Sequence, residues 1–286
     1  MDEKEDNDLI VPLSFNNQFA SFIFRNKSMN KVGYNPVIVC FLVGGILMLA
    51  ISIYMFAVMA TTSKIMVNYY TPQESLCARN NSCIISFNLP SAMNAPIYLL
   101  YRLDDFYQNH RRYVQSKSNA QLLGHVITAI DALICYPYIT NSDMKKTLAW
   151  DNVTTLDPNA IASPCGAIAY TFYNDTFSLT FNGNNIPIEQ TGITWPNDVG
   201  GKYRQAPNSN QTQWIDPQNE HFINWMRLSG LPNFQKVWGK IYQNLSPGDY
   251  TMTVTNNFNL KEWSGNKYFI LSTTSSAGAA NYLMPI

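Results

Sequence analysis

The chain has 286 residues, of which 19 are Lys or Arg and 19 are Asp or Glu, so its formal net charge is zero at pH 7. A chain without net charge creates no long-range field for a polyanion, and this excludes nucleic-acid binding as an expected function. The length permits one large domain with a substantial hydrophobic core. Charged residues make up 13% of the chain, about half of the usual share, and this balance favours an extracytoplasmic surface.

Residues 1–35 form the first predicted region. They are polar, show no sustained apolar period, and open with a cluster of five acidic residues: Asp2, Glu3, Glu5, Asp6 and Asp8. A segment with so little apolar surface cannot offset the conformational entropy that is lost on folding. We expect a flexible N-terminal tail.

Residues 36–60, PVIVCFLVGGILMLAISIYMFAVMA, contain no charged side chain. A helix of about 25 residues, rising about 1.5 Å per residue, is long enough to cross a hydrocarbon core of about 30 Å. A cleaved signal peptide would have a shorter apolar region nearer to the start of the chain. We therefore expect a transmembrane helix at 36–60.

Basic residues flank this predicted span unequally. Arg25, Lys27 and Lys31 precede it, whereas only Lys64 follows it closely. Because basic residues are enriched on the cytosolic side of membrane spans, the N-terminal tail is predicted to be cytosolic. Residues 61–286 then form a lumenal or extracellular domain.

Segments rich in β-branched and aromatic residues follow the span at 64–70, 83–89 and 96–103. Their composition and length predict strands. Residues 143–162 and 196–217 are rich in Asn, Asp, Pro and Gly, which predicts loops that cover the edges of the sheet.

Two pairs of later segments predict antiparallel strands. Residues 177–181 and 186–193 are joined by Asn-Gly-Asn-Asn, and Gly and Asn tolerate the positive φ of a hairpin turn. Residues 250–258 and 267–275 are expected to form the other pair, with Ser-Gly-Asn in the turn.

Two helices are expected between these pairs, one over about 220–228 and another after Pro232, which suits a first helical turn. Apolar residues after Pro232 recur at helical spacing and predict a buried helix face; they are Phe234, Val237, Trp238, Ile241, Tyr242 and Leu245. The elements together predict a mainly β (α+β) fold with helical insertions.

The chain has five cysteines, and Cys40 lies in the predicted span. The other four, Cys77, Cys83, Cys135 and Cys165, lie beyond it, on the side of the membrane where disulfides form. Four cysteines allow three pairings. A zinc site is not expected, because CxxC spacing and a nearby pair of His residues are both lacking.

Five Asn-x-Ser/Thr sequences beyond the span could accept N-linked glycans. Pro247 follows the sequence at Asn244 and makes that site the weakest of the five. The expected acceptors are Asn80, Asn152, Asn174, Asn210 and Asn244.

Asp104 and Asp105 are adjacent, so on a strand their side chains point to opposite faces and cannot form the facing carboxylate pair of a glycosidase. Together with His110, Arg111 and Arg112 they could still bind a metal or a phosphate, as in a type II lumenal glycosyltransferase or hydrolase. We favour a network of carboxylates and arginines that fixes a strand-to-loop corner, because metal binding would need further convergent ligands. No cofactor is expected.

We consider two further patterns as ligand-binding sites. Gly200-Gly201-Lys202 is followed by Tyr203 and does not complete a phosphate-binding loop. Tyr107, Trp195 and Trp225 would suit a glycan-binding surface receptor, although core or interface packing explains such aromatic residues equally well.

Several dense motifs point more directly to a family. They are LDDFYQNHRRYVQS at 103–116, SPCGAIA at 163–169, FYNDT at 172–176, GITWP at 192–196, HFINWMRLSGLPNF at 221–234 and ILSTTS at 270–275. In this order they resemble the cell-division-cycle-fifty, or ligand-effect-modulator, family of non-catalytic β-subunits of type-IV P-type ATPase phospholipid flippases.

The resemblance implies a membrane-anchored antiparallel β-sandwich ectodomain with helical insertions. It implies no enzymatic activity but an accessory role in the folding of the ATPase catalytic subunit, its exit from the endoplasmic reticulum and its lipid transport cycle. The implied partners are that subunit, in a heterodimer, and membrane lipids. The implied location is the endoplasmic reticulum, Golgi, endosome or plasma membrane.

The resemblance also favours the pairs Cys77 with Cys83 and Cys135 with Cys165, and makes Asn174 the best single glycan acceptor. The chain departs from the family in two respects. Many members have four cysteines in the first lumenal loop, where this chain has two. The family's second span has no counterpart in the sequence up to Ile286, which is compatible with truncation and with a natural single-span form.

Overall fold

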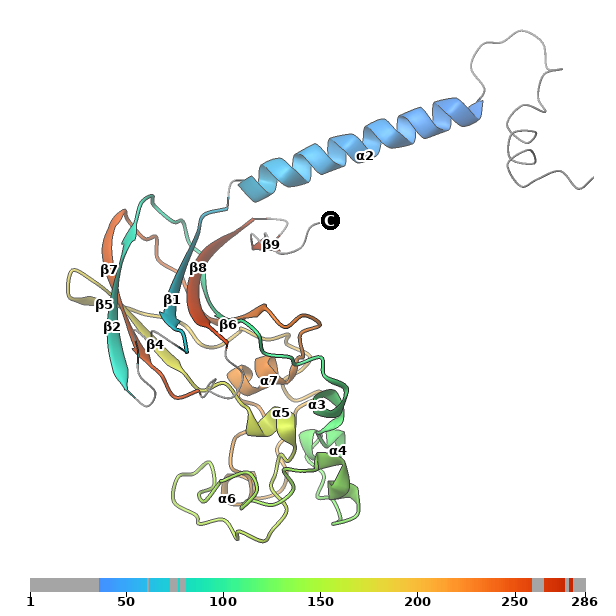
Figure 1. Cartoon of the computed structure of the whole chain (residues 1–286), viewed down its shortest axis with the longest axis vertical. Coiled ribbons are helices and arrows are strands. Elements are labelled where there is room, and N and C mark those ends of the chain that lie inside the picture. Colours follow the sequence, from blue (N-terminus) through green and yellow to red (C-terminus); the bar gives the residue numbers. More distant parts are fainter. Residues whose placement is uncertain are drawn as a thin grey trace, which may run out of the picture. The chain divides into compact units, whose positions relative to one another are not determined.

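A 25-residue helix, α2 (Pro36–Ala60), begins the described part of the chain in the computed structural model (Figure 1). The structure describes residues 36–60, 62–72, 77, 81–258, 265–275 and 278–279. Val37–Val58 is the one stretch among them that is helical, long and apolar enough to cross a membrane. Most of its large side chains are exposed, as lipid-facing side chains are. The helix predicted at 36–60 is confirmed, and the predicted tail lies outside the described residues.

Two antiparallel sheets form a second compact unit (Figure 1). The first sheet has the order β1-β8-β3-β6, with β9 paired to β8, and the second has the order β2-β7-β4-β5. The strands are β1 (Lys64–Tyr70), β2 (Ser82–Leu89), β3 (Ile97–Leu103), β4 (Thr176–Phe181), β5 (Asn184–Ile186), β6 (Phe234–Ile241), β7 (Gly248–Thr255), β8 (Lys267–Ser275) and β9 (Gly278–Ala279).

Aromatic side chains fill the space between the two sheets. Phe269 of β8 packs against Phe87 of β2, with ring centroids 5.5 Å apart, and against Phe177 of β4 at 6.4 Å. Tyr69 of β1 meets Phe177 edge to face at 5.9 Å. Aromatic pairs at these separations attract one another beyond their burial. Because each contact joins the two sheets, the unit is a β-sandwich, as the resemblance implies.

The first three predicted strands are confirmed as β1, β2 and β3. The predicted hairpin is confirmed only in part. Its turn is shorter, because Asn182 and Gly183 both have positive φ, at 50° and 79°, and place Phe181 opposite Asn184, as a two-residue turn requires. The expected second strand at 186–193 is wrong in extent. β5 ends at Ile186 because Pro187, the next residue, has no N–H for the ladder.

The expected pairing of 250–258 with 267–275 is wrong. Both strands exist, but β7 lies between β2 and β4 in one sheet, whereas β8 lies between β1 and β3 in the other. Each strand therefore has both edges occupied by partners that are distant in sequence. Adjacency along the chain does not fix pairing where a connection as long as 256–266 can cross between layers.

The helix expected after Pro232 is also wrong, because residues 234–241 form strand β6, paired with β3. Phe234, Lys236 and Trp238 alternate inward along this strand. The spacing of the apolar residues fits both a helical period and the alternation of a strand, and pairing with β3 selects the strand. Phe234, Trp238, Ile241 and Leu245 are buried as expected, whereas Tyr242 is exposed.

Helix α7 (Glu220–Met226) confirms the helix expected over about 220–228. Its N-cap, Asn219, accepts hydrogen bonds from the backbone N–H of His221 and Phe222 at 2.9 and 3.2 Å, and this satisfies two donors of the first turn. Shorter helices gather beside one end of the sandwich (Figure 1). They are α3 (Arg111–Gln115), α4 (Asn119–Leu122), the 3₁₀ helix η1 (Asp131–Cys135), α5 (Ala167–Tyr170) and α6 (Ser209–Thr212).

The sandwich and the helices share one core around Trp225 of α7, which is fully buried. Its ring lies 5.6 Å from Phe106 and 5.6 Å from Phe258. Its indole N–H donates to the carbonyl of Ile168 in α5 at 2.8 Å. Trp225 is therefore a core residue and is closed to a surface glycan.

Lys236 of β6 holds the C-terminal end of α7. Its ammonium donates to the carbonyls of Asn224 and Trp225 at 2.8 and 3.0 Å, and also to that of Arg227. Cations stabilise the unsatisfied carbonyls at a helix C-terminus. Burial, together with the charge of Arg227, nevertheless lowers the pKa of Lys236 to about 7.

This lowered pKa predicts a change of stability with pH. Between pH 7 and 9 the unfolded chain keeps the Lys236 proton and the folded chain releases it, so the free energy of unfolding should rise by up to about 2.5 kcal/mol. In Lys236→Met this contribution to the rise should vanish, while Lys240→Met, which replaces a partly buried lysine on the same strand, should keep it. Denaturant titration of the detergent-solubilised chain at both pH values, followed by tryptophan fluorescence, checks this; equal slopes in wild type and Lys236→Met would contradict it.

Candidate functional site

The motif at 103–116 forms a corner between β3 and α3. Asp104 accepts a hydrogen bond from the Arg102 guanidinium at 2.7 Å, and both side chains are largely buried. Asp105 has a φ of 57°, and its N–H donates to the Asn233 side chain at 2.9 Å. An ion pair lies at the expected corner, but Arg102 makes it; the predicted partners, Arg111 and Arg112, are exposed on α3. These contacts favour the structural interpretation of the acidic pair over a metal site.

The rest of this motif packs against the motif at 221–234. The Gln108 side chain is buried and accepts from the N–H of Ser229 at 3.0 Å. The Asn109 side chain donates to the carbonyl of Gly230 at 3.0 Å. Phe106 joins the core described above, while Tyr107 is exposed. The two motifs thus form the two sides of one internal contact, called here a seam.

The motif SPCGAIA at 163–169 forms a second seam around the disulfide between Cys135 and Cys165, whose Cα atoms are 5.7 Å apart. Ser116 donates to the carbonyl of Cys135 at 3.0 Å and accepts from the N–H of Ala167 at 2.9 Å. Gly166 has a φ of 106°, and a Cβ there would lie 2.2 Å from the Ser116 carbonyl oxygen. Only glycine fits this close approach.

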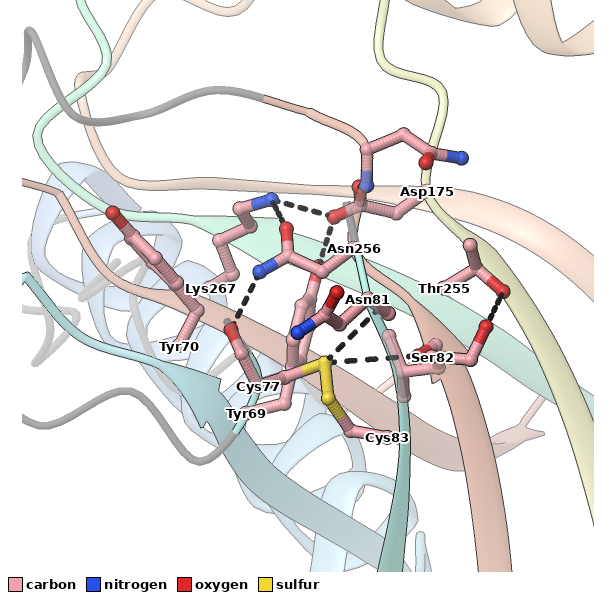
Figure 2. Close-up of a disulfide and its surroundings, with 12 residues drawn as sticks. Tyr69, Tyr70, Cys77, Asn81, Ser82, Cys83, Asp175, Thr255, Asn256 and Lys267 are labelled. Carbon is pink, nitrogen blue, oxygen red and sulfur yellow. Dashed lines mark hydrogen bonds and ion pairs between the residues drawn. A yellow bond between two sulfur atoms is a disulfide. The ribbon is translucent and has the colours of Figure 1, made fainter. Parts of the chain in front are cut away.

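A buried ion pair lies at the centre of the second compact unit. The carboxylate of Asp175 accepts from the ammonium of Lys267 and from the Tyr69 hydroxyl, both at 2.7 Å (Figure 2). Its other oxygen accepts from the backbone N–H of Asn257 and Phe258, both at 2.6 Å. The side chains of Asp175 and Lys267 are both 0% exposed. Four donors on one buried carboxylate make it a structural anchor that is closed to substrate.

The same network reaches the short disulfide, Cys77–Cys83, whose Cα atoms are 5.4 Å apart. Lys267 donates to the Asn256 side-chain oxygen at 2.5 Å, and the Asn256 amide donates to the carbonyl of Cys77 at 2.7 Å (Figure 2). Lys267 also donates to the carbonyl of Phe258. Asn256 therefore joins the covalent link at the start of β2 to the buried ion pair.

Two tyrosines extend this network into the core. The Tyr69 hydroxyl lies 2.8 Å from that of Tyr173. Burial, and then the charge of Asp175, raises the pKa of Tyr69 well above 10, and burial likewise raises the pKa of Tyr173. Both phenols are therefore neutral donors at any physiological pH, which suits a carboxylate acceptor.

Sequence reasoning missed this ion pair. Asp175 lies within the Asn-Asp-Thr sequence that marks a glycan acceptor, and Lys267 begins a strand 92 residues away. The one signal was a lysine at the start of an otherwise apolar segment, which is more often a solvated strand end. Sequence spacing holds no information on such a distant pair.

Other predicted site residues lie apart from this network. His110 and His125 are exposed, and His221 is half-buried against Trp238. Within the described ranges, no three side chains of His, Cys, Asp or Glu come together as a metal site requires. Asn152, Asn174, Asn210 and Asn244 are exposed, and Asn80 lies outside the described residues.

Comparisons with known proteins agree with the motifs. The model of the LEM3 (ligand-effect modulator 3) family / CDC50 family matches residues 60–286. Cell cycle control protein 50A of Bos taurus is 30% identical, and the match covers 87% of this chain and 77% of the relative. Cell cycle control protein 50C of Mus musculus is 30% identical, covering 87% and 80%. ALA-interacting subunit 3 of Arabidopsis thaliana is 31% identical, covering 71% and 58%. The chain belongs to the CDC50/LEM3 family.

Proposed function

We propose that this chain is a non-catalytic accessory subunit of a type-IV P-type ATPase lipid flippase. In this role it binds the catalytic subunit in a heterodimer, supports its folding and exit from the endoplasmic reticulum, and takes part in its lipid transport cycle. The family match across residues 60–286 carries the proposal. The name of the Arabidopsis relative, ALA-interacting subunit 3, adds that this relative acts by binding another protein.

The structure supports a rigid binding domain. Polar residues of its motifs make internal contacts: Asp104 with Arg102, Gln108 with Ser229, and Asp175 with Lys267. A buried network with its hydrogen bonds made, such as the one around Asp175 and Lys267, restricts a fold to one arrangement. Such a domain presents a fixed surface to a partner at a low entropic cost.

We place this domain on the lumenal or extracellular side of the membrane. The unequal basic residues around α2 predict that orientation, and two disulfides suit an oxidising compartment. The implied location is a membrane of the endoplasmic reticulum, Golgi, endosome or cell surface.

A pull-down of the tagged full chain from gently solubilised membranes tests the function. Mass spectrometry should recover a type-IV P-type ATPase together with the chain. Uptake of a fluorescent phospholipid should fall when the chain is depleted and recover when it is restored. If no such ATPase is recovered and lipid uptake is unchanged, the proposal is wrong.

Glycan attachment tests the orientation. We expect Asn174 to carry an N-linked glycan, because its side chain is exposed immediately before β4 and Thr176 completes the acceptor sequence. Asn174→Gln and Thr176→Ala should each increase electrophoretic mobility by one glycan, whereas Thr176→Ser should not, because serine preserves the sequence. Asn244, which accepts a hydrogen bond from Ala95 N–H at 2.8 Å, should show lower occupancy by glycopeptide mass spectrometry. Unmodified Asn152, Asn174 and Asn210 together would contradict the lumenal placement.

A further inference from the structure

One open pocket lies beside the C-terminal end of α7, within the second compact unit. It has a volume of about 310 Å³ and is called here the Trp195 pocket. The residues that line it come from the GITWP motif, the loop after it and the C-cap of α7; they are Trp195, Pro196, Asn197, Asp198, Lys202 and Arg227. None of them belongs to the buried ion-pair network.

Glu220 of α7 fixes the chain just before Trp195. Its carboxylate accepts from the backbone N–H of Gly192, Ile193 and Thr194 at 2.8, 2.8 and 3.0 Å. Burial alone would raise the pKa of Glu220, but the hydrogen bonds from Gly192 and Thr194 hold it below its usual value. The Glu220 carboxylate therefore stays charged at neutral and mildly acidic pH.

Asp198 fixes the chain just after Trp195. Its buried carboxylate accepts from the Nε of Arg227 at 2.8 Å, from one Nη of the same side chain, and from the ammonium of Lys202 at 3.1 Å. Gly200 and Gly201 permit the tight loop that returns Lys202 to Asp198: Gly200 has a φ of 74°, and a Cβ on Gly201 would lie 2.1 Å from the Asn197 carbonyl oxygen. Glu220 at the start of α7 and Arg227 at its C-cap thus hold the segment at both ends.

The segment around Trp195 exposes an indole ring and two neighbouring cationic side chains to solvent. Trp195 is 68% exposed, and the Arg227 guanidinium lies 5.8 Å from its ring centroid. The Lys202 side chain is 74% exposed. Two cations and one carboxylate leave the pocket with a net charge of about +1. Exposed Trp and Arg on a rigid support are the residues most enriched in the energetic centres of protein interfaces.

We infer that the Trp195 pocket receives a carboxylate side chain, flanked by an apolar residue, from an extracytoplasmic loop of the ATPase subunit. This rests on the proposed function. The carboxylate would pair with Lys202 and the outer edge of Arg227, while the apolar neighbour packs on Trp195. A dianionic phosphate fits less well, because Asp198 already offsets one of the two positive charges and occupies two donors of Arg227.

The test uses the tagged full chain and the ATPase that the wild-type chain captures, with capture measured as a function of ATPase concentration. Trp195→Ala should raise the half-saturating concentration by about thirtyfold, as truncation of a central interface tryptophan does. Lys202→Gln should raise it by a few-fold and weaken its dependence on salt, because an exposed charge acts through a screened attraction.

Two matched variants serve as controls. Tyr242→Ala removes an aromatic side chain of similar exposure, 66%, and Lys145→Gln removes an exposed lysine from another loop; both should bind as the wild type does. Thermal unfolding should be the same in all four variants.

If Trp195→Ala and Lys202→Gln bind like the controls while the wild type captures the ATPase, the pocket inference fails and the proposed function stands. If they lose binding to phosphatidylserine vesicles instead, the pocket is a lipid site and the inference is wrong. If the wild type captures no ATPase, both proposals fail.

Discussion

Asp175→Asn is expected to lower the free energy of unfolding by about 3–5 kcal/mol, because it leaves the ammonium of Lys267 buried without a counter-charge. Lys267 is 0% exposed and donates to Asp175, Asn256 and Phe258. An asparagine in place of Asp175 could keep one acceptor but not the charge that offsets the desolvation of the lysine. Denaturant unfolding of the detergent-solubilised full chain measures the loss. In cells, the same variant should be retained before its glycans mature.

The reverse change, Lys267→Met, should cost a similar amount, because it leaves the Asp175 carboxylate buried with only neutral donors. The double variant Asp175→Asn with Lys267→Met should lose less than the sum of the two, since no unpaired buried charge remains. Asp249→Asn is the control: its carboxylate is exposed and accepts from Asn88 at 2.6 Å, so its loss should stay below about 1 kcal/mol. Additive losses in the double variant would show that Asp175 and Lys267 act independently, against the geometry in Figure 2.

The sequence predicts most strands because their residues carry the preference themselves. β1 and β3 are rich in aliphatic and aromatic residues and have strand-like lengths. β6 is different, because its apolar residues also fit a helical period, and only its pairing with β3 and the burial of Lys236 select the strand. β7 and β8 were individually predictable, but their assignment to different sheets depends on contacts with β2 and β1. Local sequence preference thus predicts where individual strands form, whereas long-range pairing determines which sheet each strand joins.

The candidate sites divide in the same way. Asp104 is adjacent to β3 in sequence, so its role at a corner could be predicted, although its partner, Arg102, is closer than the arginines first considered. Asp175 gave no such signal, because its acceptor-sequence context is local while its charge partner lies 92 residues away. The Trp195 pocket also depends on distant residues, since Arg227 lies in the motif at 221–234 and Asp198 in the loop after the motif at 192–196. Residues whose function is to join segments cannot be assigned from one segment alone.

Removal of the longer disulfide by Cys135→Ala with Cys165→Ala is the second change with a large expected effect. The bond closes a loop with a sequence separation of 30, and constraint of the unfolded chain by such a loop is worth about 3.5 kcal/mol in the chain-entropy treatment. Alanine is preferred to serine because both positions are buried, and a serine hydroxyl there would add an unsatisfied polar group. The folded seam should persist in part, because Gln121 still binds Cys165 N–H and Ala162 C=O.

Loop length and local contacts predict opposite rankings of how much the two disulfides stabilise the fold. A comparison of the two can therefore separate these effects. Cys77–Cys83 has a sequence separation of only 6, for which the same treatment gives about 2–2.5 kcal/mol. However, Cys77 also supplies the carbonyl that holds Asn256 against Lys267. If chain entropy dominates, Cys77→Ala with Cys83→Ala should lower the free energy of unfolding less than Cys135→Ala with Cys165→Ala does. If the network dominates, the Cys77 and Cys83 variant should lose more stability, and this additional loss should disappear in a Lys267→Met background. Denaturant midpoints of the three variants decide between these outcomes. We expect the longer disulfide to matter more, because the Cys77 carbonyl survives substitution and the neighbouring ladder of β2 with β7 keeps Asn256 in place through Asn81.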